Sequence, residues 1–248
     1  MTTATLEQKQ QVLGTTQRIG LVAYGAAAGL VVAAGWYALI ARHVTVAAPP
    51  LVEAGVPIDM VLHRYYAWFV PTLQQERIDT AIAIVAFVCL VPIASALRDR
   101  LGQASWLTLI GATGVAVGAI TWVIGNVVAL GGHRAVGLMA THGNPIETVN
   151  AIGFTIDTID DAFELAAFAL IGAGALAFGW VALHDRRAPR GWGWLSLAVG
   201  IVTLTLSAAY ATGEGNLVDL LLVSGGVVLL PAWLVSTGRF LRRTSGFA

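Results

Sequence analysis

Charged residues are scarce in this sequence, and their scarcity limits the class of protein it can encode. Lys, Arg, Asp and Glu make up 11% of the 248 residues, whereas an average soluble domain has about 25%. Lys9 is the only lysine, so arginine carries nearly all the positive charge. Hydrophobic residues reach 57%, and a soluble fold needs more polar surface than this. The composition therefore predicts an integral membrane protein.

Cysteine and catalytic motifs are also nearly missing. Cys89 is the only cysteine, which excludes a disulfide within the chain and a thiolate metal cluster. The sequence contains no nucleotide-binding loop, no Gly-x-Ser-x-Gly and no His-Glu-x-x-His. No cofactor is required by any motif, and no catalytic residue is indicated. The arginines flank apolar runs, so we interpret them as orientation signals and lipid contacts, not as a nucleic-acid site.

Long apolar runs are what the sequence has in abundance, and a membrane-spanning helix needs about 20 such residues. We predict an all-α bundle of six transmembrane helices over 19–241, between a segment 1–18 and a tail 242–248. Residues 1–18 do not resemble a secretory signal, so the first run is expected to stay in the membrane. Long outer loops are predicted at about 43–78 and 131–153. The six predicted helices are Ile19–Ile40, Asp79–Leu97, Ser105–Leu130, Phe154–Leu183, Gly193–Tyr210 and Leu217–Leu241.

The charges are distributed unequally between the two sides that this topology creates. The side with both termini holds ten of the 14 basic residues and three of the 14 acidic ones, a net charge of +7. The opposite side holds four basic and 11 acidic residues, a net charge of −7. Basic residues gather in the cytoplasm, so we predict a plasma-membrane protein with both termini cytoplasmic. The positive-inside rule does not require the acidic excess outside, which therefore needs another explanation.

Smaller features refine the expected bundle. Pro92 and Pro231 lie inside predicted helices and are expected to kink them. The glycines of Gly111-x-x-Gly114-x-x-x-Gly118 and Gly172-x-Gly174 indicate close helix packing. Residues Met60–Val70 are expected to form a short helix lying on the membrane surface, because their Tyr and Trp side chains suit an interface.

An internal repeat relates the second and third helices to the fourth and fifth. Ala96-Leu97-Arg98-Asp99-Arg100 matches Ala182-Leu183-His184-Asp185-Arg186, and Trp106-Leu107-Thr108-Leu109 matches Trp194-Leu195-Ser196-Leu197. Each unit has two helices, so the copies share one orientation and form a parallel repeat. The alternative is convergence, because any cytoplasmic turn favours Arg and any interface favours Trp.

The chain also resembles a bacterial family of six-helix integral membrane proteins of unknown function. The resemblance rests on Arg18-Ile19-Gly20, on the charged turn Arg98-Asp99-Arg100 and on the segment Ala188-Pro189-Arg190-Gly191-Trp192-Gly193-Trp194. It is diffuse, covers most of the chain and includes no catalytic signature. It implies the topology and assigns no functional residue.

Acidic residues gather at the outer end of the predicted fourth helix. Asp157, Asp160 and Glu164 are spaced i, i+3 and i+7 and share a face, with Asp161 beside them. The 19 residues from Leu165 to Leu183 span roughly 28 Å of helix, against a hydrocarbon core of about 30 Å. Glu164 is therefore expected at the outer boundary of the membrane. Three further polar residues are predicted near this level, which gives the candidate set Asp157, Asp160, Asp161, Glu164, Asp219, Asn126 and Asp79.

Several functions are compatible with this acidic layer. Our leading hypothesis is the binding or conduction of a cation or small solute from the outside, because intramembrane carboxylates often mark ion or proton paths. A divalent metal held by His142, His133, Glu164 and Asp160 would instead indicate a metal-dependent membrane enzyme. A docking surface would indicate a non-catalytic subunit of a larger complex or a homo-oligomer. The structural alternative is a solvated rim, stabilised by the helix N-terminus and neighbouring arginines.

Overall fold

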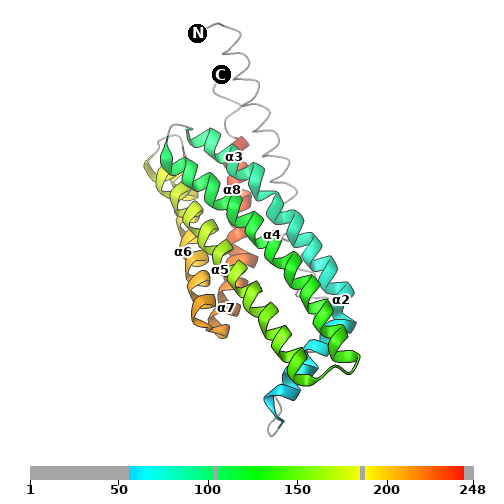
Figure 1. Ribbon diagram of the computed structural model, residues 1–248. Helices are drawn as coiled ribbons and strands as arrows, with labels where there is room; N and C mark the ends of the chain where they lie inside the picture. The colour runs from blue at the N-terminus through cyan, green and yellow to red at the C-terminus, as the bar shows by residue number, and fades with distance from the viewer. Residues whose placement is uncertain (1–55, 103–104, 185–187, 243–248) are drawn as a thin grey trace.

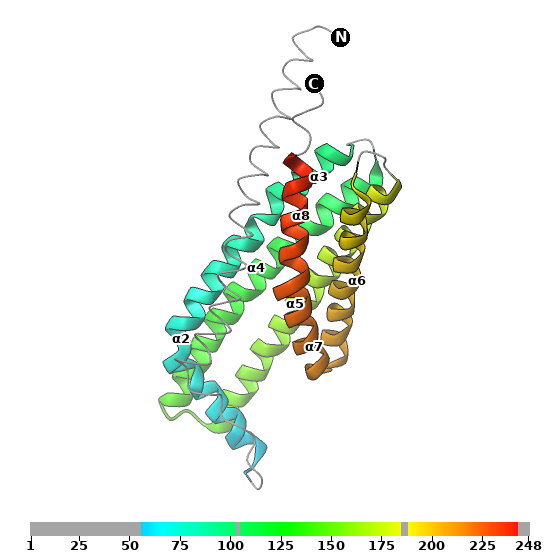
Figure 2. The same cartoon turned by 180° about the vertical axis from the view of Figure 1, so that it is seen from behind.

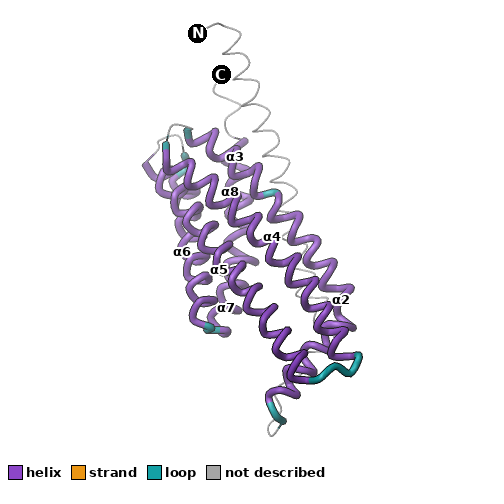
Figure 3. The backbone as a smooth tube through the Cα atoms, in the orientation of Figure 1, coloured by secondary structure: helices purple, strands orange, loops and turns teal. Residues whose placement is uncertain are grey.

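The computed structural model describes residues 56–102, 105–184 and 188–242, and all regular structure in these ranges is helical (Figure 3). Five helical segments are long and apolar enough to cross a membrane: Glu76–Leu101, Trp106–Thr141, Ile146–His184, Arg190–Thr212 and Ser224–Leu241. They correspond to the predicted second to sixth helices. The predicted first helix, Ile19–Ile40, lies outside the described residues.

The helices form one elongated bundle (Figure 1). α2 and α3 run beside α4, α6 lies along α5, and α8 returns past α6 and α3. Figure 2 shows α8 from the other side of the bundle, between α2 and α6. The elements are α2 (Ile58–Val88), α3 (Leu90–Leu101), α4 (Trp106–Thr141), α5 (Ile146–His184), α6 (Arg190–Thr212), α7 (Gly215–Leu221), the π-helix η1 (Leu222–Leu229) and α8 (Leu230–Arg242).

Glycine brings the central helices into close contact, as the sequence predicts. A Cβ added to Gly114 would lie 2.7 Å from the carbonyl oxygen of Leu170, and one added to Gly174 would lie 2.8 Å from that of Gly111. On the other side of α5, a Cβ on Gly172 would lie 3.0 Å from the carbonyl oxygen of Gly200 on α6. Only hydrogen fits at these crossings, so backbone packs directly against backbone.

Both predicted proline distortions coincide with helix irregularities. Pro92 lies in the first turn of α3, directly after the break at Cys89 that separates α3 from α2. Pro231 is the second residue of α8 and follows the π-helix η1, where Gly225 and Gly226 occur. Proline cannot donate to the preceding turn, so the hydrogen-bonding pattern changes just before each one.

The predicted outer loops are largely helical, which corrects the expected outline. α4 continues to Thr141 and α5 begins at Ile146, so the loop expected at 131–153 is reduced to a short turn at Gly143, where φ is +77°. Likewise α2 begins at Ile58, and the expected loop 43–78 is helical over its described part from that residue. The segment Met60–Val70 is a helix, but it belongs to α2, and Tyr66 and Phe69 within it are buried.

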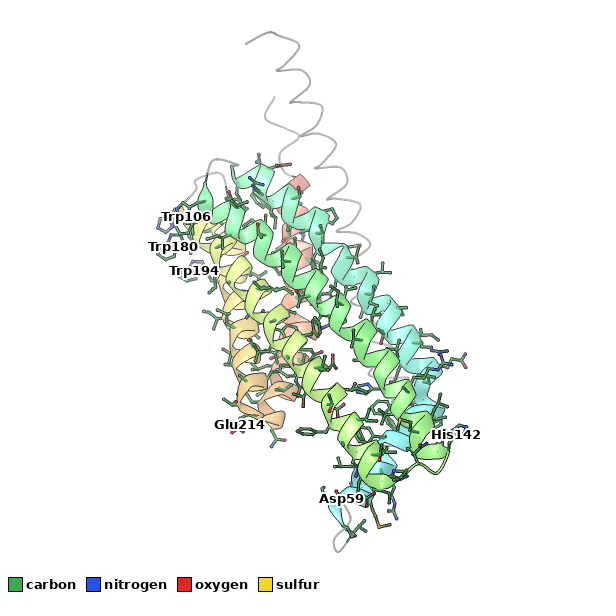
Figure 4. All side chains as sticks on the ribbon, viewed as in Figure 1. Asp59, Trp106, His142, Trp180, Trp194 and Glu214 are labelled. Carbon is green, nitrogen blue, oxygen red and sulfur yellow. The ribbon has the colours of Figure 1, made fainter. Side chains whose placement is uncertain are left out.

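These longer helices extend the bundle well beyond one bilayer. α4 has 36 residues and α5 has 39, or roughly 54 and 58 Å of helix, whereas the 23 residues of α6 span roughly 35 Å. Figure 4 shows Trp106, Trp180 and Trp194 together at one end, Asp59 and His142 at the other, and Glu214 between these levels. A hydrocarbon core of about 30 Å would take up little more than half the length of α4 or α5, so each helix is longer than a membrane crossing requires.

The described part of the bundle has two separate hydrophobic cores along its length. The larger core joins α3, α4, α5, α6 and α8 and includes Leu97, Val115 and Phe178. The smaller core lies where α2 meets the C-terminal part of α4 and the N-terminal part of α5, and comprises Tyr66, Phe69, Val136, Ala140 and Val149. We call this second region the extension. The acidic face of α5 lies between the two cores.

Candidate functional site

The acidic residues lie in the middle of α5 and not at its start. Asp157 comes 11 residues after Ile146, the first residue of the helix, or roughly 16 Å along it. The stabilising effect of a helix N-terminus fades within its first turn. The explanation of these acids as N-terminal residues of a helix is therefore wrong, because the helix begins at Ile146 and not at Phe154.

Asp157 connects all three helices of the extension. The Tyr66 hydroxyl on α2 donates a hydrogen bond of 2.9 Å to Asp157 Oδ2. His133 Nε2 on α4 lies 2.9 Å from Asp157 Oδ1, which becomes an ion pair when the imidazole is protonated. Phe69 stacks on His133 with ring centroids 4.4 Å apart. Asp157 is thus held by two partners from two other helices.

Tyr66 owes its position to a glycine. Its side chain is 1% exposed, and a Cβ added to Gly153 on α5 would lie 2.2 Å from Tyr66 Cζ. Burial is the largest cause that raises the pKa of Tyr66 above its usual range. The hydrogen bond to Asp157 and the negative charge of Asp157 raise it further. The phenol therefore stays protonated at neutral pH and acts as the donor.

Glu164 lies two turns further along α5, in different surroundings. It lines a cavity of about 330 Å³ between α5, α6, η1 and the α2–α3 region. The hydroxyl of Tyr210, near the end of α6, forms a hydrogen bond with Glu164, and Phe168 stacks on the Tyr210 ring with centroids 5.9 Å apart. The Ser207 hydroxyl donates a hydrogen bond of 2.9 Å to the carbonyl oxygen of Leu165, and this bond connects α6 to α5 beside Glu164.

The two remaining acids of this face lie between Asp157 and Glu164. Asp160 is half-buried, and its Oδ1 has no hydrogen-bond partner among the described residues. Asp161 is exposed. The four carboxylates predicted to share a region therefore do so, but Asp157 and Glu164 have different partners.

The other predicted site residues occupy positions that differ from the prediction. The amide of Asn126 donates to the carbonyl oxygen of Trp122 on its own helix, 3.0 Å away. Asn126 lies 15 residues before the end of α4, because this helix continues past its predicted end at Leu130. Asp79 lies inside α2 and does not open a helix, and Asp219 lies in α7. The side chains of these two acids are outside the described part of the structure.

The predicted metal centre does not form among the described residues. His142 lies after α4, with Nδ1 2.6 Å from the carbonyl oxygen of Leu138, and His133 contacts Asp157. Within the described ranges, no three His, Cys, Asp or Glu side chains lie together so as to hold a metal ion. The prediction that His142, His133, Glu164 and Asp160 come together as one metal site is therefore wrong for the described structure.

Sequence reasoning missed Tyr66 and Tyr210 as partners of the acids, and it missed the cavity. Tyr66 lies 91 residues from Asp157, so no local spacing connects the two. Comparison of the chain with models of protein families, with curated proteins and with solved structures finds no match. The resemblance to a six-helix bacterial family thus stays a prediction.

Proposed function

We propose that this chain is a plasma-membrane protein that binds, and conducts or takes up, a small cation or cationic solute at Glu164. The observation that carries the proposal is that Glu164 is the one ionisable side chain lining the cavity between the described helices. A carboxylate buried in apolar surroundings is costly, and such groups in membrane proteins often belong to ion or solute sites.

The placement of Glu164 supports access from the outer side. Glu164 lies beside the last two turns of α6, through its contact with Tyr210, and α6 is about as long as a bilayer is thick. The basic residues at the opposite end of the bundle favour a cytoplasmic location for that end. Asp157, Asp160 and Asp161 then lie outside the cavity, where their negative charge attracts cations toward it.

Cation binding by the purified protein in nanodiscs tests the proposal. We would measure the midpoint of thermal unfolding with Na⁺, K⁺, Mg²⁺ and tetramethylammonium, and repeat it for Glu164→Gln and Asp160→Asn. We expect at least one cation to stabilise the wild type, and Glu164→Gln to abolish that stabilisation. Asp160→Asn should weaken it less, because Asp160 does not line the cavity. Equal responses of the wild type and both variants to every cation would reject the proposal.

A second candidate, a non-catalytic subunit of a larger membrane complex, is favoured by apolar side chains exposed on the extension. Phe154 is 68% exposed and Ile58 is 59% exposed, in a region that projects from the predicted membrane-filling part. Exposed apolar side chains outside lipid are typical of docking surfaces. Under this alternative, a stoichiometric partner that co-purifies with the wild type should be lost in Phe154→Ser and retained in Glu164→Gln.

A further inference from the structure

The lining of the cavity beside Glu164 is almost entirely apolar. Its walls are mainly aliphatic side chains and glycine, and three aromatic side chains, Phe87, Trp122 and Phe168, contribute from three different elements. Phe87 and Trp122 stack on each other with centroids 3.9 Å apart, which fixes their planes. An apolar lining with one charged group is typical of a site for an organic molecule with a charged end.

Two polar side chains of the lining, Thr203 and Glu164, already form hydrogen bonds within the protein, but Glu164 has acceptor positions to spare. The Thr203 hydroxyl donates to the carbonyl oxygen of Val199 on its own helix. Tyr210 supplies one hydrogen bond to Glu164, whereas a carboxylate has about four acceptor positions. A positive charge at this point would offset the cost of burying the carboxylate.

The lining also indicates which cations fit. Ca²⁺ and Mg²⁺ need about six or more oxygen ligands, and the lining offers one carboxylate and a hydroxyl that is already bonded. Aromatic rings, in contrast, attract organic ammonium groups through their faces. The volume of about 330 Å³ is near the lower end of the range of about 300–1,000 Å³ for small-molecule pockets, so the ligand is small.

We propose that this cavity binds a small amphiphilic organic cation, with its ammonium group against Glu164 and its apolar body between the aromatic and aliphatic walls. The proposal rests on the proposed function and adds the chemical class of the ligand. It requires both halves of the molecule: the charge for Glu164 and the apolar body for the cavity. Either half alone should bind much more weakly.

A glycine of the π-helix η1 allows the lining of the cavity to be changed by a substitution that causes no steric clash. Gly226 lines the cavity, and a Cβ added to it would meet nothing within 4 Å. Gly226→Leu therefore adds a bulky side chain at the lining of the cavity without a steric clash at its Cβ. Gly131 on α4 is a matched control, since it is exposed, has no atom within 4 Å of an added Cβ and does not line the cavity.

Benzyltrimethylammonium is a suitable probe because it has two analogues that each keep one half. Neopentylbenzene has the same shape without the charge, and tetramethylammonium keeps the charged head without the ring. We would measure equilibrium dialysis of labelled benzyltrimethylammonium against the protein in nanodiscs, with empty nanodiscs subtracted and each analogue as a competitor. We expect benzyltrimethylammonium to bind about tenfold more tightly than either analogue.

The variants separate this inference from the proposed function. Glu164→Gln and Gly226→Leu should each lose benzyltrimethylammonium binding, and Gly131→Leu should keep it. If tetramethylammonium competes equally and Gly226→Leu binds normally while Glu164→Gln does not, the ligand class is wrong and cation binding at Glu164 stands. If neopentylbenzene competes equally, or if benzyltrimethylammonium does not bind, the inference is overturned. The thermal-unfolding measurements with inorganic cations then test the proposed function separately. Should Gly226→Leu not fold, Glu164→Gln and the two analogues still decide the outcome.

Discussion

Asp157 and Glu164 lie seven residues apart on one face of α5, but one is held by polar partners and the other borders an apolar cavity. Asp157 receives a hydrogen bond from Tyr66 and contacts His133, each at 2.9 Å, at the junction of three helices. Glu164 forms a hydrogen bond with Tyr210 and is surrounded by aliphatic and aromatic walls. The same residue class on the same helix face thus meets two different environments.

The difference suggests a division of roles along α5. A carboxylate with two charge-assisted contacts to other helices stabilises their arrangement. A carboxylate beside a cavity with spare acceptor capacity destabilises the free protein and is available to a ligand. We therefore expect Asp157 to stabilise the packing of helices in the extension and Glu164 to bind the ligand.

The largest effect is expected from Gly153→Ala, which acts on Asp157 through Tyr66. The added Cβ would lie 2.2 Å from Tyr66 Cζ, so the ring must move and its hydroxyl must leave Asp157. Steric strain and the lost hydrogen bond together should cost about 2–4 kcal/mol of unfolding free energy. Denaturant unfolding in detergent measures the change.

Gly131→Ala is the matched control for this substitution. No atom lies within 4 Å of its added Cβ, and replacing an exposed helical glycine by alanine should stabilise the protein by up to about 1 kcal/mol. Equal stability changes in the two variants would show that Tyr66 does not depend on Gly153 for its position.

A second test removes the negative charge from each carboxyl in turn. Asp157→Asn loses charge-assisted contacts to Tyr66 and His133 and should lower the unfolding free energy by about 1–3 kcal/mol. Glu164→Gln removes a charge from an apolar cavity, so it should change stability by less than about 1 kcal/mol or increase it. The contrast between the two carboxyls is wrong if Glu164→Gln destabilises the protein as much as Asp157→Asn does.

The sequence predicted the part of the fold around the larger core better than it predicted the extension. Apolar runs and glycine spacing are local signals, and they located the helices and the close contacts at Gly114 and Gly174. Residues 131–141 and 146–153 contain Gly, His, Arg and Asn, which by themselves favour a loop. They are helical because their small and apolar side chains, such as Val136 and Val149, pack against Tyr66 and Phe69 of α2.

The same limit applies to the candidate site. Helical periodicity placed Asp157, Asp160 and Glu164 on one face, because their spacing is local. The partners that distinguish Asp157 from Glu164 come from α2, α4 and α6, and the cavity is lined by residues of eight elements. Such long-range contacts leave no pattern within a single helix, so the sequence predicted the acids as one group and not as two environments.

The smallest effect is expected at alkaline pH and comes from the buried phenol of Tyr66. The pKa of Tyr66 is raised in the folded protein above the usual value of about 10, first by burial and then by Asp157. Above pH 10 the unfolded chain releases this proton and the folded protein keeps it, so the unfolding free energy falls as pH rises. This contribution should amount to about 0.8 kcal/mol at pH 10.5 and should be missing in Tyr66→Phe.

Unfolding curves at pH 8 and pH 10.5 measure this difference. The wild type should lose more stability between the two pH values than Tyr66→Phe does, and Asp157→Asn should lie between them, because burial of Tyr66 remains while the carboxylate charge is removed. Ionisation of the other tyrosines is common to all three proteins and cancels in the comparison. If Tyr66→Phe loses as much stability as the wild type, the folded protein does not hold the phenol of Tyr66 in its protonated form. That outcome would contradict the buried, hydrogen-bonded position of Tyr66 on which the predicted effect of Gly153→Ala depends.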